Sequence, residues 1–189
     1  MYFDELDEFL DNIRTLKIAR SEEKRQVVEE DIIDEMLDLY LLGFYEGAKD
    51  AGEELGVNVD PSVEEAQEII NRPVAGKTFR ERVREYVSGN MGDTTGTPEE
   101  AIARVAETDA VRIYNESKLN TAKRHGATSK TWNTMEDNRV RDSHYPLDKV
   151  TVPIDAYFYT YDGDKATAPS QFTLPQNNVN CRCWLTFSK

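Results

Sequence analysis

A histidine and two cysteines are the residues of this sequence with the clearest chemistry. Cysteines two positions apart on a strand point the same way, so the thiols of Cys181 and Cys183 could reach one point about 2.3 Å from each sulfur. His144 could close on that point, with Asp137 or Asp142 as a fourth ligand. Zinc favours this mixture of sulfur and imidazole ligands. One interpretation of the pattern is therefore a bound zinc ion.

The two cysteines also fit other interpretations. They fall in register with Val179, Leu185 and Phe187, where reduced cysteines behave as small core residues. A disulfide between strand residues two apart would have strained geometry. A cysteine–histidine nucleophile pair lacks the glycine-rich turn or helix N-terminus that favours a thiolate. The sequence leaves zinc ligands, buried thiols and a disulfide open.

Arginines gather around the same histidine. Arg139 and Arg141 alternate on a short segment that we expect to be extended, so their side chains would share one face. A guanidinium can bind a carboxylate or a carbonyl, which favours an internal polar network bracing the β-rich part. Phosphate or DNA contact and catalysis are the alternatives. His125 beside Gly126 is typical of a helix end, where the imidazole caps the helix, and a role as a metal ligand is the alternative.

Composition limits the class of protein. The chain has 189 residues and a net charge of −13, which argues against a surface devoted to nucleic acid phosphates. No apolar run approaches the roughly 20 residues that span a bilayer. The acidic start lacks the layout of a signal peptide, so we expect synthesis in a reducing cytoplasm. The motifs of nucleotide-binding proteins, zinc proteases and serine hydrolases are absent, which favours a protein that is not an enzyme.

The acidity is concentrated near the N-terminus. Residues 1–60 contain 18 acidic and 6 basic side chains, whereas residues 61–189 contain 18 acidic and 17 basic ones. Such a block is typical of a solvated helix face, and a basic docking partner is the sharper alternative. An apolar stripe from Val28 to Phe44 is broad enough either to bind a partner or to pack on neighbouring helices.

Periodicity predicts helices followed by strands. Apolar residues at three- and four-residue steps and capping residues predict helices at 2–18, from Ser21 to about Gly52, after Ser62, at 77–88, and from Thr97 to about Arg124. Strict alternation predicts a strand over 179–187. The fold class is α+β: a helical region (1–95) suited to docking on a larger assembly, then a compact module (97–189) of one helix and a small antiparallel sheet.

The C-terminal half contains an ordered set of motifs. A tryptophan precedes an Asp-x-Arg-x-Arg segment, a histidine, a Leu-Asp pair and a closing Asn-Cys-Arg-Cys. Over about residues 97–187 this order resembles the phage head morphogenesis domain of the phage Mu F-like minor head proteins. Lys149 stands where that family usually has glycine. The residues that match the family motifs are Trp132, Asp137, Arg139, Arg141, His144, Asn180, Cys181, Arg182 and Cys183.

The resemblance implies a minor capsid protein of a tailed phage or prophage, structural in role. Such a protein would lie in the virion, inside the capsid near the portal vertex, and would assist head assembly or genome packaging and delivery. Its partners would be the portal protein or the major capsid protein, with packaged DNA as a further partner and no membrane. We expect several copies on a symmetric assembly.

Two other functions fit the residues. A zinc-dependent hydrolase or nuclease, or a toxin-like transferase, delivered with the genome, would use the predicted metal with an open coordination position. A DNA-associated scaffold would bind with a steep salt dependence.

Overall fold

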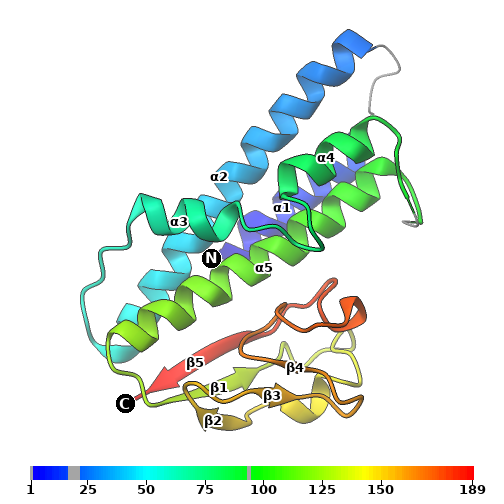
Figure 1. Ribbon diagram of the computed structural model, residues 1–189. Coiled ribbons are helices and arrows are strands. Elements are labelled where there is room, and N and C mark those ends of the chain that lie inside the picture. Colours follow the sequence, from blue (N-terminus) through cyan, green and yellow to red (C-terminus); the bar gives the residue numbers. More distant parts are fainter. Residues whose placement is uncertain (1, 17–21, 93–94) are drawn as a thin grey trace.

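Helices lie over a small β layer in the computed structural model, which describes residues 2–16, 22–92 and 95–189 (Figure 1). Within this part of the chain no helix has the length and apolarity needed to cross a bilayer. The α+β prediction is confirmed. The helices are α1 (Tyr2–Thr15), α2 (Glu22–Leu55), α3 (Val63–Ile70), α4 (Phe79–Val87) and α5 (Pro98–Arg124), and the strands are β1 (Ser129–Asn133), β2 (Thr151–Pro153), β3 (Phe158–Tyr159), β4 (Lys165–Ala166) and β5 (Trp184–Ser188).

Capping residues start the later helices where the sequence predicts. The Thr97 hydroxyl accepts from the backbone of Glu100, whose carboxylate accepts from the backbone of Thr97. This reciprocal pair satisfies amides that the first helical turn leaves free. Ser62 caps α3 in the same position, through its side chain alone. The predicted start of α2 at Ser21, and Lys17 at the end of the first predicted helix, lie outside the described residues.

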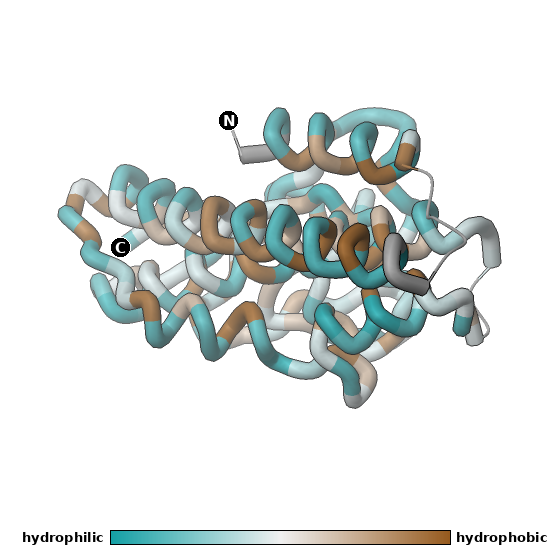
Figure 2. Tube along the Cα trace, turned by 90° about the horizontal axis from the view of Figure 1, so that it is seen from above, coloured by the Kyte–Doolittle hydropathy of each residue, from teal (hydrophilic) through white to brown (hydrophobic). Residues whose placement is uncertain are grey.

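The apolar stripe of α2 is buried inside the protein. Ile32, Met36, Tyr40 and Phe44 are each at most 3% exposed and belong to a core formed with α1, α3, α4 and α5. α1 turns its hydrophobic residues toward the other helices (Figure 2). From Ile32 to Phe44 the stripe is therefore internal packing, and the interpretation of this part as a partner-binding surface is wrong. The physical reason is that a stripe this broad contacts neighbours on two sides.

α5 is the central element. Its buried residues lie on the side facing α2 and on the side facing β5, so it separates the helices from the sheet (Figure 1). α2 approaches it so closely that a Cβ at Gly47 would lie 2.3 Å from the Tyr114 carbonyl oxygen. Only glycine fits at this crossing. The Ser117 hydroxyl donates to the Phe44 carbonyl at 2.6 Å, which links the two helices.

The main sheet is antiparallel, with strand order β2-β1-β5. Trp132 of β1 pairs with Leu185 of β5, and Lys130 pairs with Val152 of β2. Pro153 lies in the edge strand β2, where a missing amide hydrogen costs no ladder bond. β3 and β4 form a separate antiparallel pair.

The last strand is shorter than its sequence pattern. The prediction of a strand over 179–187 is wrong for its first half, because β5 begins only at Trp184. Asn180 has a left-handed backbone (φ +56°), which an extended strand does not tolerate. Alternate burial nevertheless holds, since Cys181, Cys183 and Leu185 are all buried. Lys149 is also left-handed (φ +59°), which is the conformation suited to the glycine usual in the resembling family.

Two hydrophobic cores meet in α5. Its N-terminal and middle residues, including Ile102 and Ile113, join the helical core, and Leu119 and Ala122 join the core of the sheet. The helix thus contributes to both cores. The division into units at 1–95 and 97–189 stays a prediction.

Asn115 joins the helices to the sheet and gives a stability test. Its amide donates to the Cys183 carbonyl at 3.0 Å, and its carbonyl oxygen accepts from the Leu185 amide at 3.0 Å. Asn115→Leu leaves both backbone groups buried without a partner, so we expect the free energy of unfolding to fall by about 3 kcal/mol. Urea denaturation measures it. The control Asn120→Ala, on the same helix, should change it by no more than about 0.5 kcal/mol, and an equal loss in both variants would contradict the bridge.

Candidate metal site

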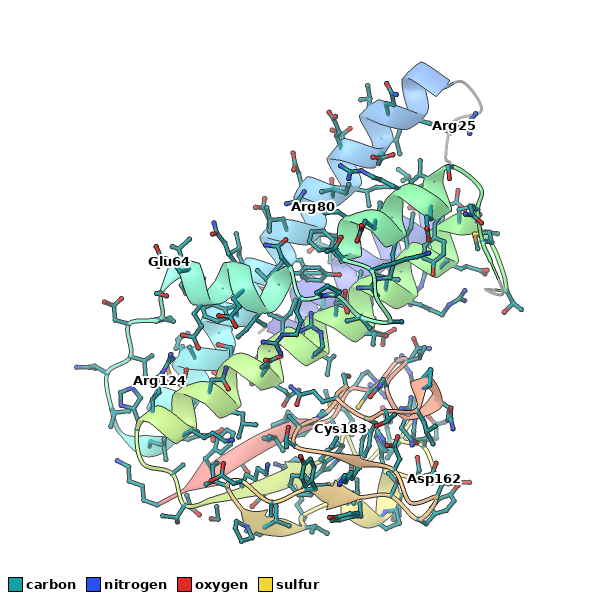
Figure 3. The ribbon with its side chains drawn as sticks, in the orientation of Figure 1. Arg25, Glu64, Arg80, Arg124, Asp162 and Cys183 are labelled. Carbon is teal, nitrogen blue, oxygen red and sulfur yellow. The ribbon has the colours of Figure 1, made fainter. Side chains whose placement is uncertain are left out.

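The histidine and the two cysteines of the sequence prediction meet in the structure. His144 Nδ1 lies 3.6 Å from Cys181 Sγ and 3.6 Å from Cys183 Sγ. The ligand atoms of the three residues lie within 4.8 Å of one another, and all three side chains are buried. Both cysteines are free thiols, not a disulfide. Cys183 lies in the β layer just below α5 (Figure 3).

A chain of hydrogen bonds positions the histidine. Ser143, next to His144, donates its hydroxyl to the Asn177 side chain at 3.0 Å, and the Asn177 amide donates to Asp164 at 3.1 Å. Asp164 also accepts from the backbone amides of Thr173 and Leu174. The turn that carries His144 is thereby fixed to the segment that leads to the cysteines.

Aromatic rings surround the imidazole. The Trp132 ring contacts His144 edge-on at a centroid distance of 5.4 Å, and Phe172 lies at 5.2 Å in a tilted arrangement. Asn178 holds Phe172 in place, because its side chain both donates to and accepts from the Phe172 backbone. His144 Nε2 is buried without a hydrogen-bond partner among these rings. The imidazole therefore interacts through Nδ1, which faces the two sulfurs.

A small cavity opens beside the three residues. Its volume is about 10 Å³, close to the space of one water molecule. Besides His144 and the cysteines it is lined by three arginines, Arg139, Arg141 and Arg182. The site therefore combines soft ligand atoms with three positively charged side chains that line the cavity.

The arginines have separate partners. Arg141 donates to the Val179 carbonyl, and Arg139 lies 3.9 Å from the Glu107 carboxylate. The expected alternation of these arginines on one extended face is wrong, because Asp137 accepts from the Arg139 amide and bends the segment into turns. Burial raises the pKa of Glu107 despite the nearby Arg139. Arg141 and Arg139 thus make contacts on two sides of the site, in agreement with the predicted internal polar network.

Asp137 lies apart from the cluster. Its carboxylate accepts two bonds from Arg182, at 2.7 and 2.9 Å, and this pairing holds its pKa below the usual range. It does not belong to the group of His144, Cys181 and Cys183. Asn180, another predicted residue, supplies the left-handed turn immediately before Cys181.

The thiols differ in acidity. The hydrogen bond with Cys183 lowers the pKa of Cys181 well below its usual value, against the opposing effect of burial, and His144 acts in the same direction. The same pairing and burial raise the pKa of Cys183. The site can hold negative charge on a sulfur, which is the form that binds metal ions. Chemically, it can act as a ligand set or as a hydrogen-bonded thiol pair.

Several supporting residues escape sequence reasoning. Asp164, Asn177 and Ser143 carry the network that positions His144, yet each has a common residue type in a turn-rich stretch. Asp162-Gly163-Asp164 signals a turn and nothing more. Only the folded chain shows which carboxylate is buried there.

Comparison with known proteins identifies the fold family. Residues 68–186, from α3 to β5, match the family described as Phage Mu protein F like protein. The chain belongs to this family. The predicted resemblance is therefore confirmed for this phage head morphogenesis family, and the match begins at residue 68, earlier than the predicted start near residue 97. No solved structure matches the chain.

One relative of the chain is named as a transferase. NAD(+)–arginine ADP-ribosyltransferase EFV of Enterococcus faecalis is 27% identical to the Mu F-like chain over 143 residues. The similar region covers 61% of this chain and 29% of that protein, so the chain spans less than a third of its relative's length.

The Asp164 network gives a pH-dependent prediction. Burial opposes ionisation of Asp164, but bonds from Leu174, Asn177 and Thr173 outweigh it and hold its pKa below the usual value. A carboxyl whose pKa is lowered by folding adds stability above its unfolded pKa of about 3.9 and loses that contribution as the pH falls. We expect Asp164→Asn to lower the free energy of unfolding by about 2 kcal/mol at pH 7.

Urea denaturation at several pH values tests this expectation. The difference between wild type and Asp164→Asn should shrink as the pH falls below about 4. The exposed Asp142 serves as the matched control, and Asp142→Asn should leave the unfolding free energy nearly unchanged. A difference that stays constant down to pH 2 or so would contradict the role of the ionised carboxylate.

Proposed function

We propose that this Mu F-like chain is a structural minor head protein that binds at the portal vertex and assists head assembly or genome packaging. The observation that carries the proposal is the family match over residues 68–186, which spans α4, α5 and the sheet. Arg141, Ser143 and Arg182 around the candidate site each bond to other residues of the chain, which supports a structural role. The portal protein and the major capsid protein are the proposed partners.

The docking surface in this proposal is the groove between α1 and α2. Two adjoining hollows of about 240 and 340 Å³ lie there. The partly buried Phe9 and the buried Leu39 contribute to the floor, and the exposed carboxylates of Asp31, Glu35 and Asp38 form the rim. An apolar floor with an acidic rim fits a basic amphipathic helix. We therefore assign the groove to a basic segment of the portal or major capsid protein.

Charge reversal in the groove tests docking. Asp31→Lys with Glu35→Lys should weaken capture of the portal or major capsid protein by about tenfold or more, because both side chains would repel a basic partner. Co-expression with each partner of the same phage, followed by affinity capture at two salt concentrations, measures this. Capture by the wild type should itself weaken at high salt.

A matched control lies on α3. Glu64 and Glu68 are exposed acidic residues outside the groove, so Glu64→Lys with Glu68→Lys makes the same change of net charge and should leave capture intact. Equal recovery of partner with both double variants would contradict docking in the groove. Point variants are preferable to deleting residues 1–60, because α2 supplies much of the helical core.

A second candidate function is arginine ADP-ribosyl transfer, the activity for which the Enterococcus relative is named. The purified chain should transfer no label from NAD⁺ to agmatine, whereas that relative serves as the positive control. Transfer by this chain would overturn the non-enzymatic part of the proposal. Such transfer would not bear on the docking proposal, which the charge-reversal variants test separately.

A further inference from the structure

The spacing of one buried nitrogen from two buried sulfurs matches a metal coordination sphere. In tetrahedral zinc sites, bonds of about 2.3 Å to sulfur and 2.0–2.1 Å to nitrogen separate the two atoms by about 3.6 Å. His144 Nδ1 lies 3.6 Å from each of the two sulfurs. We propose that His144 Nδ1, Cys181 Sγ and Cys183 Sγ bind one zinc ion. This inference does not depend on the proposed head function.

The chemistry of the donors selects the metal. Two thiolates and one imidazole are soft and borderline ligands, which favour zinc over calcium or magnesium. Two thiolates also neutralise a divalent cation, so the complex formed in this buried site has no net charge and avoids the high cost of burying an ion. Each cysteine and His144 is at most 4% exposed.

The fourth coordination position of the zinc ion would be filled by a ligand other than these three side chains. Within the described residues, no other histidine, cysteine or carboxylate joins the group, and Asp137 is engaged by Arg182. The adjoining cavity of about 10 Å³ has room for one water-sized ligand. Arg141 lines it and has a buried Nη1 without a hydrogen-bond partner. A water, hydroxide or small anion thus completes the sphere, facing the arginines.

The ion would join distant parts of the chain. His144 precedes a turn that begins at Tyr145, and the cysteines precede β5, 37 and 39 positions further on. Binding would close this loop and hold the start of β5 against α5, where Asn115 already contacts Cys183. Because the unfolded chain lacks the preformed site, zinc would stabilise the folded state.

Metal analysis of the full chain tests the proposal directly. Protein purified under reducing conditions, or the metal-free form titrated with Zn²⁺, should hold about one zinc ion per chain. Replacement with Co²⁺ should give the sulfur-to-metal charge-transfer and intense d–d absorption of a tetrahedral thiolate site. Bound zinc should also protect both thiols from alkylation and raise the melting temperature. These measurements on wild-type protein need no variant to fold.

Variants then assign the ligands. Cys181→Ser, Cys183→Ser and His144→Ala should each reduce bound zinc to a small fraction. His125→Ala, the matched histidine control at the end of α5, and Asp137→Asn should keep about one zinc ion per chain. Absence of stoichiometric zinc in the titrated wild type would overturn the site in favour of a hydrogen-bonded thiol pair. Loss of zinc in Asp137→Asn would overturn the three-ligand assignment.

Discussion

Burial of most of α5 governs how the other elements pack around it. A helix covered by other helices on one side and by a sheet on the other cannot leave polar side chains without partners. Three buried polar residues in its C-terminal half are paired in this way: Asn115 with the backbone around β5, Ser117 with the Phe44 carbonyl, and Lys118 with Glu54. These pairings fix how α2 and β5 lie against the helix.

The geometry of the candidate metal site depends on these contacts of α5. Asn115 holds the chain at Cys183 and Leu185, so the segment that contains both cysteines has a defined position beneath α5. The network through Asn177 brings the turn of His144 to the same place. The three side chains come from two loops, and neither loop has regular structure at the site. Hydrogen bonds to backbone and side chains, more than strand geometry, make them converge.

The acidic groove and the buried site differ in character. The groove of α1 and α2 is acidic and lies apart from the family-matched β module, whereas the site near His144 is buried and lined by arginines. A head protein needs one surface for its assembly partner and a stable fold to carry it. An acidic groove on the surface and a separate buried cluster are consistent with these two requirements.

Local periodicity and the order of motifs are enough to predict the helices, the capped starts of α3 and α5, the burial pattern of the last strand and the family. They also indicate His144, Cys181 and Cys183 as candidate ligands. The folded structure was needed to show that Asp137 pairs with Arg182, that Arg139 and Arg141 diverge, and that the α2 stripe from Ile32 is internal. It alone assigned Asp164 and Asn177 to the support of the histidine. Those outcomes depend on contacts between residues far apart in the chain, which local patterns do not encode.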